Sequence, residues 1–336
     1  MEKEIIVSAQ HLSIGYRYKG VSTPIHENLD FTLKCGELTS LLGPNGAGKS
    51  TLMRTISHLQ PLLSGSITLS GKELSSYNEK ELSRTIGIIL TDKTQTGGLT
   101  VNELVALGRQ PHTGFFGRLS KQDKERIESS IQAVGLSSKK GSYMAELSDG
   151  ERQKAMIAKT LVQECPLILL DEPTAFLDAA SRIEITQLLH EIAKEENRAI
   201  LLSTHDIEQA LVLSDQIWLL TQQGLTCGTP EDLVLNLQMD KLFEGKNVQF
   251  DKQRGSFSPS INFQKEIFVT ASEDSLLHWG VNAINRLGFG QASTPQGHIQ
   301  IHLMDKNQIL YKGEKGEETT LSSFEEMTNF ITQKEK

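Results

Sequence analysis

The sequence predicts an α/β fold with a mixed sheet and a helical subdomain, followed by a small α+β domain. Apolar segments at residues 37–42, 167–170 and 199–203 have the length of buried strands, and helix-patterned segments follow each of them. The segment 167–170 is apolar at every position, which is typical of a strand covered on both faces. A chain of 336 residues also exceeds one ordinary core, so a second domain is expected.

The hydrophobic pattern divides the chain into consecutive parts. We expect a first domain over residues 1–240, with a helical subdomain at about 96–165 inside it. Residues 241–262 are polar and contain glycine and proline, so they are interpreted as a linker. The strand, helix, strand, strand and helix patterns that follow indicate a small α+β accessory domain over residues 263–336.

Composition indicates a globular protein of the cytoplasm. The net charge is −8 and the pI is near 5.7, so nucleic acid is not an expected partner. Cys35, Cys165 and Cys227 lack paired spacing, which argues against a disulfide framework and a zinc site. The N-terminus lacks a signal-peptide pattern, and the longest apolar runs have strand length. Work at a membrane would therefore need a partner protein.

Residues 43–51 match the phosphate-loop pattern G-x-x-x-x-G-K-[ST] at every fixed position, between a predicted strand and a predicted helix. Lys49 is expected to reach the β- and γ-phosphates of a nucleotide, and the Ser50 hydroxyl to ligate Mg²⁺. A glycine-rich turn without a ligand is the much weaker alternative. The nucleotide-binding residues expected here are Asn45, Gly46, Ala47, Gly48, Lys49, Ser50 and Thr51.

Polar side chains follow two further predicted strands. Asp171 and Glu172 end the apolar segment 167–170, and His205 follows the segment 199–203. An uncompensated pair of carboxylates would be costly at a buried strand end, so we expect Asp171 to hold Mg²⁺. Glu172 is then placed to polarise a water aimed at the γ-phosphate, and His205 to contact that phosphate. Glu172 as a helix terminus and His205 as a structural histidine are the weaker alternatives.

Aromatic and histidine side chains elsewhere carry less information. Tyr16 lies near the end of a predicted edge strand, where its ring either stacks on a nucleotide base or is an ordinary strand-end side chain. From the residues, the two interpretations are equal. His298 and His302 share a predicted strand face without a third ligand, which favours a solvated face over a metal site.

Five motifs in order over residues 5–235 resemble those of the ABC-type ATPases. They are the phosphate loop, residues 147–153, residues 167–174, residues 175–178 and His205. In that family they are the Walker A motif, the signature, the Walker B motif, the D-loop and the switch histidine. Residues 99–114 further resemble the ATP-binding subunits that import iron–siderophore, haem or vitamin B12.

The resemblance implies a homodimer that binds ATP and Mg²⁺ between its subunits. Ser148 and Gly150 of one subunit would meet the γ-phosphate held by Lys49 of the other, because a helix N-terminus is an anion site. ATP hydrolysis would then drive an integral membrane permease, supplied by a substrate-binding protein, from the cytoplasmic face of the inner membrane. The protein itself would be peripheral.

Two departures from the family pattern concern the site. Thr91 stands where the family usually has a glutamine that touches Mg²⁺ or the attacking water. Asp149 and Glu151 replace a glycine and a glutamine of the signature, and Asp149 is expected to point away from the phosphate. The departures at Thr91 and Asp149 keep one alternative open, a nucleotide-dependent regulatory module without useful hydrolysis. A soluble ABC ATPase not coupled to transport is a separate alternative.

Overall fold

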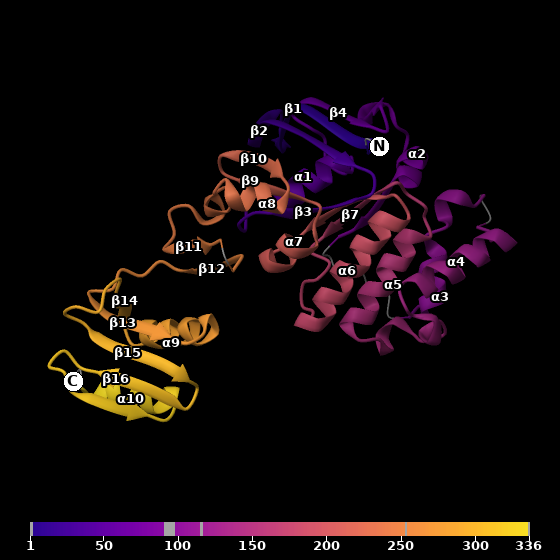
Figure 1. Cartoon of the computed structure of the whole chain (residues 1–336). Helices are drawn as coiled ribbons and strands as arrows, with labels where there is room; N and C mark the ends of the chain where they lie inside the picture. Colours follow the sequence, from indigo (N-terminus) through magenta and orange to yellow (C-terminus); the bar gives the residue numbers. More distant parts are fainter. Residues whose placement is uncertain (1–2, 91–97, 115–116, 253, 335–336) are drawn as a thin grey trace. The chain divides into compact units, whose positions relative to one another are not determined.

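The computed structural model describes residues 3–90, 98–114, 117–252 and 254–334 (Figure 1). The chain divides into two compact units, Met1–Ser258 and Pro259–Lys336. Each unit has a hydrophobic core of its own.

Within the described residues, the first unit is organised around a six-stranded sheet in the order β10-β9-β3-β8-β7-β6. All neighbours pair in parallel except β10 and β9. Carboxyl ends of parallel strands meet at one edge of a sheet, so the segments after β3, β7 and β8 come together there. The strands are β3 (Glu37–Leu42), β6 (Ile86–Ile89), β7 (Leu167–Asp171), β8 (Ala199–Ser203), β9 (Gln216–Thr221) and β10 (Gly224–Gly228).

The two faces of this sheet pack against different elements. Ile168 and Leu170 of β7 pack in a cluster with residues of α3, α4, α5 and α6, whereas Leu167 and Leu169 pack with α1. Burial on both faces explains why β7 is apolar throughout. The helices of the first unit are α1 (Lys49–Ile56), α2 (Glu79–Thr85), α3 (Val101–Leu107), α4 (Lys121–Ala133), α5 (Asp149–Leu161), α6 (Ala179–Glu195), α7 (Ile207–Leu213) and α8 (Pro230–Leu235).

A second, antiparallel sheet covers the α1 side in the order β2-β1-β4-β5. It consists of β1 (Ile5–Tyr18), β2 (Val21–Lys34), β4 (Ser64–Leu69) and β5 (Lys72–Glu73). The sequence predicted β1 as an edge strand, and this was wrong. The strand pairs with β2 on one side and with β4 on the other, and its residues Val7, Leu12 and Ile14 are fully buried.

The helices α3, α4 and α5 are held together by a buried ion pair. Arg109 is 4% exposed, and its guanidinium donates to the Asp123 carboxylate at 2.8 Å and to the Glu164 carboxylate at 2.7 Å. Hydrogen bonds from the Ser120 hydroxyl and backbone, together with Arg109, lower the pKa of Asp123 to about 2. A buried guanidinium needs such partners, so this network fixes the packing of the helical region.

The segment interpreted as a linker carries structure of its own. It contains β11 (Val248–Asp251) and β12 (Ser256–Pro259), which form a small hairpin. Phe257 packs edge-on against Phe243 and at a tilt against Phe250, and these rings cover the cluster that contains Ala210 of α7. The polar composition of the segment 241–262 therefore gave no sign of this aromatic contact. The first unit extends to residue 258.

The second unit is a sheet in the order β14-β13-β15-β16-β17, and its core includes residues of α9 and α10. Its strands are β13 (Lys265–Ala271), β14 (Phe289–Gln291), β15 (Ile299–Asp305), β16 (Gln308–Lys312) and β17 (Glu318–Leu321), and its helices are α9 (Asp274–Arg286) and α10 (Phe324–Lys334). The short strands β14 and β17 were not predicted. His302 Nδ1 lies 2.8 Å from the Thr270 hydroxyl, its cross-strand neighbour.

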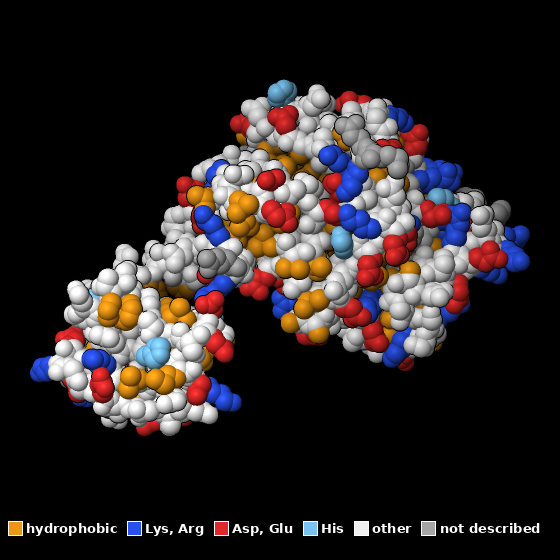
Figure 2. Space-filling view, in the orientation of Figure 1, with side chains coloured by type: hydrophobic (Ala, Val, Ile, Leu, Met, Phe, Trp, Pro, Cys, Tyr) orange, Lys and Arg blue, Asp and Glu red, His pale blue; other side chains and the backbone are white. Residues whose placement is uncertain are grey.

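Acidic and basic side chains are interspersed over the face of the molecule shown in Figure 2. No helix among the described residues has the length and apolarity needed to cross a membrane.

Candidate functional site

The phosphate loop joins β3 to α1 in the geometry that its sequence predicts. Gly48 has φ +93°, a left-handed conformation that favours glycine. A Cβ at Gly43 would lie 2.4 Å from the carbonyl oxygen of Leu220, so the close approach of β9 requires a glycine there. Lys49 begins α1, and its ammonium donates to the carbonyl of Gly43 at 2.8 Å. The loop thus wraps around the ammonium group that was predicted to meet phosphate.

Two side chains from the antiparallel sheet reach this loop. His26 is 7% exposed, and its Nε2 lies 2.7 Å from the Ala47 carbonyl oxygen. The Tyr16 hydroxyl lies 3.3 Å from the Thr51 hydroxyl, while the Tyr16 residue is 55% exposed. Sequence analysis identified Tyr16 but missed His26, because nothing in the local pattern around His26 indicates a contact with Ala47, 21 residues further along the chain.

The acidic residues after β7 are linked to the end of β8. Asp171 pairs with Ser203 in the sheet register, and the Ser203 hydroxyl donates to the Asp171 carboxylate at 2.6 Å. The same hydroxyl accepts the Glu172 backbone N–H at 2.9 Å. Ser203 therefore positions both acids, and the sequence interpretation did not include it.

Glu172 and His205 are in direct contact. His205 Nε2 lies 2.7 Å from the Glu172 carboxylate. Glu172 also has φ +50°, a backbone conformation that costs about 1–3 kcal/mol for a residue other than glycine. Such strain persists where the surroundings hold a side chain in place, here through Ser203 and His205.

Electrostatics connects the phosphate loop to the acids. Burial lowers the pKa of the Lys49 ammonium, and the nearby charges of Glu172 and Asp171 oppose this shift. One edge of the sheet therefore carries a lysine, two carboxylates and an imidazole within electrostatic reach of one another.

The signature residues lie at the N-terminus of α5. Ser148 caps the helix in a reciprocal arrangement, since its hydroxyl accepts the Glu151 backbone N–H and its own N–H donates to the Glu151 carboxylate. Asp149 forms an ion pair with Arg152 on the same helix. Gly150 lies against α6, where an added Cβ would be 3.2 Å from the Ser181 hydroxyl.

Within one chain the signature and the phosphate loop belong to different parts of the first unit. The helix α5 packs on the sheet face that holds α3, α4 and α6, whereas α1 packs on the opposite face. Thr91, Asp92 and Gln95 lie outside the described residues.

Comparison with known proteins agrees with this arrangement. A family model described as ABC transporter matches residues 26–175. The ferric enterobactin transport ATP-binding protein of Escherichia coli K12 is 35% identical over 235 residues, which cover 70% of this chain and 85% of that protein. The chain belongs to the ABC transporter ATP-binding proteins. It is an ATPase of this family.

Another relative matches a larger part of this ABC ATPase than the enterobactin protein does. An uncharacterized ABC transporter ATP-binding protein of Methanocaldococcus jannaschii is 35% identical over 297 residues, covering 88% of this chain and 100% of that protein. This match exceeds the 258 residues of the first unit and so extends into the second. Among solved structures, an ABC transporter assigned to the metal-chelate type, in an inward-facing conformation, has a TM-score of 0.62 and 25% identity. That match covers 76% of this chain and 96% of the other.

The donor set of the ABC ATPase fits Mg²⁺. Ser50 offers an exposed hydroxyl in the first turn of α1, and Asp171 offers a carboxylate at the end of β7. Mg²⁺ prefers hard oxygen donors and is commonly held by one or two carboxylates together with substrate phosphates. No group of three or more His, Cys, Asp or Glu side chains among the described residues could hold a metal ion.

The bridging role of Ser203 can be measured. Ser203→Ala removes the hydroxyl that holds Asp171 and Glu172, so we expect a loss of about 1–3 kcal/mol in the free energy of unfolding and a lower kcat. Ser40→Ala is the matched control, because Ser40 is equally buried in this sheet and bonds the Ser214 hydroxyl at 2.6 Å. Chemical denaturation and steady-state phosphate release should show a similar stability loss in both variants, with kcat reduced in Ser203→Ala alone. Equal kcat values would contradict the role of Ser203.

Proposed function

We propose that this ATPase energises an importer of iron–siderophore or a related metal chelate. It would work as a homodimer on the cytoplasmic face of the cell membrane, bound to an integral membrane permease. The names of the relatives support the cargo class, since one transports ferric enterobactin and another belongs to a transporter assigned to the metal-chelate type. The proposal includes haem and cobalamin-type cargoes, because residues 99–114 resemble subunits that import iron–siderophore, haem or vitamin B12.

The placement of Ser148 and Lys49 in different parts of the first unit carries the dimer proposal. The N-terminus of a helix such as α5 is an anion site, and in a head-to-tail dimer it would face the phosphate loop of the other subunit. Asp149 is compatible with this role, because Arg152 neutralises its charge beside the helix N-terminus. Each ATP would then lie between two subunits and stabilise their association.

The hydrolytic roles follow from the contacts at the sheet edge. Lys49 binds the β- and γ-phosphates, and the backbone of residues 45–51 surrounds them. Glu172 accepts a hydrogen bond from the attacking water, whose oxygen bonds to the γ-phosphorus as the bond to the bridging oxygen of ADP breaks. His205 keeps Glu172 in place and contacts the γ-phosphate, and Tyr16 stacks on the base. Mg²⁺, held by Ser50 and Asp171, would neutralise phosphate charge when bound.

Mixing two inactive variants tests the shared site. Lys49→Ala lacks the phosphate-binding ammonium, and Ser148→Arg blocks the signature. A mixed dimer has one site with both defects and one site with neither, so we expect the mixture to hydrolyse ATP when each variant alone does not. Phosphate release from the re-equilibrated mixture is the measurement, with circular dichroism as the check on folding. An inactive mixture of folded variants would contradict a site formed by two subunits.

Purification from native membranes tests the transport proposal. The tagged full-length chain is isolated after gentle solubilisation, and the proteins that accompany it are identified. A stoichiometric polytopic membrane protein supports the importer, and the identity of that protein indicates the cargo. Recovery of soluble partners or ribosomes without such a protein would overturn the importer and favour a soluble ABC ATPase.

A further inference from the structure

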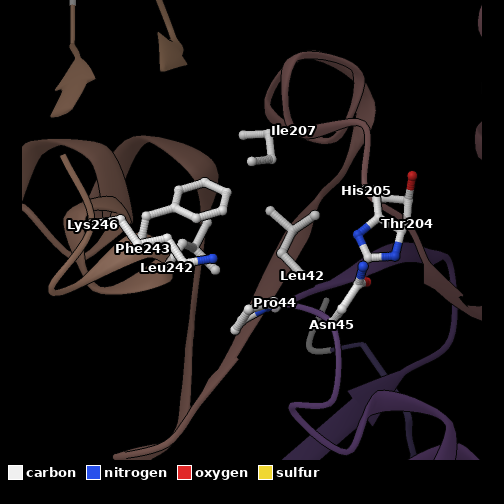
Figure 3. Close-up of a pocket in the computed structure, with 10 residues that line it drawn as sticks. Leu42, Pro44, Asn45, Thr204, His205, Ile207, Leu242, Phe243 and Lys246 are labelled. Carbon is white, nitrogen blue, oxygen red and sulfur yellow. The ribbon is translucent and has the colours of Figure 1, made fainter. Parts of the chain in front are cut away.

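A small cavity lies beside the phosphate loop and is bordered by His205. Its volume is about 220 Å³ (Figure 3). Apolar groups from three segments line it, and they are Leu42, Pro44, Ile207, Leu242 and Phe243. In Figure 3 the side chain of Asn45 lies beside the His205 ring, while Phe243 and Lys246 stand on the opposite side.

An exposed aromatic ring projects from the loop that carries Glu172. Phe176 is 82% exposed and has φ +67°, an unusual conformation for a phenylalanine. Two residues further, the exposed carboxylate of Asp178 caps α6 by accepting the Ser181 backbone N–H. This loop therefore presents an apolar ring and, close to it, a negative charge.

The cavity and the hollow that Phe176 borders share two lining residues. Thr204 and His205 line the cavity beside the phosphate loop, and they also line the hollow that Phe176 borders. Both features therefore belong to the edge of the sheet where the phosphate loop lies. In a two-fold dimer formed through this edge, the loop of each subunit can face the cavity of the other.

We propose that Phe176 of each subunit inserts into this cavity of the other subunit in the ATP-bound homodimer. The inference rests on the homodimer proposed above. Size supports it, since a cavity of about 150 Å³ already admits benzene and this one is larger. Charge supports it as well, because the Asp178 carboxylate follows the ring while Lys246, an exposed residue of opposite charge, lines the cavity.

If Phe176 inserts into the cavity, residues 242–246 contact the other subunit in the dimer. Leu242, Phe243 and Lys246 form one wall of the cavity. Phe243 also packs against Phe257 of the hairpin, with 4.7 Å between ring centroids. The wall of the cavity is therefore continuous with the aromatic contact that ends the first unit.

The affinity of the ATP-bound dimer tests the proposal. Both the reference and the variants carry Glu172→Gln, so that bound ATP persists, and dimer dissociation is measured by sedimentation. Phe176→Ala removes two buried rings per dimer and is expected to weaken the dimer by about 10-fold or more. Val212→Ala is the matched control, because Val212 is an apolar residue with 78% exposure outside the cavity, and its effect should be less than 2-fold.

A crosslink tests the contact itself. Phe176→Cys and Phe243→Cys are combined in a chain that also carries Glu172→Gln and Cys227→Ser, since Cys227 is the exposed cysteine among the described residues. Oxidation with ATP present should give a covalent dimer in the double variant, and neither single variant should form it. A dimer from Phe176→Cys alone would place the two rings together and overturn the insertion.

The outcomes separate this inference from the proposed function. If the reference chain forms no dimer with ATP, the homodimer itself is wrong. If the reference dimerises but Phe176→Ala matches it and the double variant does not crosslink, the homodimer stands and the insertion is wrong. The same outcome, a dimer unaffected by Phe176→Ala and without a crosslink, is expected if the cavity binds a small ligand instead of Phe176.

Discussion

Glu172→Gln is expected to abolish ATP turnover while leaving ATP binding intact. The amide retains the shape of the side chain and its contact with His205, but it cannot take a proton from the attacking water. General-base catalysis contributes about 10²–10⁴-fold, so kcat should fall by that factor. Steady-state phosphate release gives kcat, and a fluorescent ATP analogue gives the affinity.

Glu184→Gln is the control for this substitution. Glu184 pairs with Lys154 on the surface of α6, so its loss should leave kcat unchanged. Wild-type turnover in Glu172→Gln would show that another group activates the water.

Lys49→Ala is expected to weaken ATP binding by about 100-fold. A hydrogen bond to a charged group is worth about 1.5–3 kcal/mol, and the ammonium is expected to contact two phosphates. Folding should be nearly unaffected, because the substitution removes a buried charge together with its bond to the Gly43 carbonyl. Equilibrium binding of ATP and thermal unfolding measure the two effects.

Lys154→Ala provides the comparison. Lys154 is a partly buried lysine outside the site, and its ion pair with Glu184 leaves the phosphate loop untouched. Binding of ATP by Lys49→Ala with the affinity of Lys154→Ala would contradict the role of the loop lysine.

The parts of the site that follow from local pattern could be predicted from the sequence. Residues 43–51 carry their glycines and lysine at fixed spacing, so the chemistry of the phosphate loop is contained in one segment. The apolar segments 37–42, 167–170 and 199–203 have the length and context of buried parallel strands, and they are β3, β7 and β8 of the sheet. Because Glu172 and His205 follow two of these apolar segments, the pattern also predicted that both lie at the carboxyl-terminal edge of the sheet.

The parts that depend on register or on distant packing could not be predicted. Ser203 reaches Asp171 because the two strands pair in one register, and no local pattern fixes that register. The pairing of β1 on both sides likewise requires knowledge of which strands lie beside it. In the segment 241–262, glycines and polar residues dominate the composition, so the contact between Phe243 and Phe257 has no periodic signature.

The sheet that both hydrophobic clusters share has a consequence for unfolding. Neighbouring residues of β7 and β8 point alternately into the two clusters, so helices cannot leave one face without exposing part of a strand whose other face is still packed. If the helices left one face only, the sheet would lose apolar burial on that face. The strands would stay ordered, so no conformational entropy would be gained in return. The backbone amides of β7 and β8 should therefore exchange hydrogen only when the whole first unit unfolds.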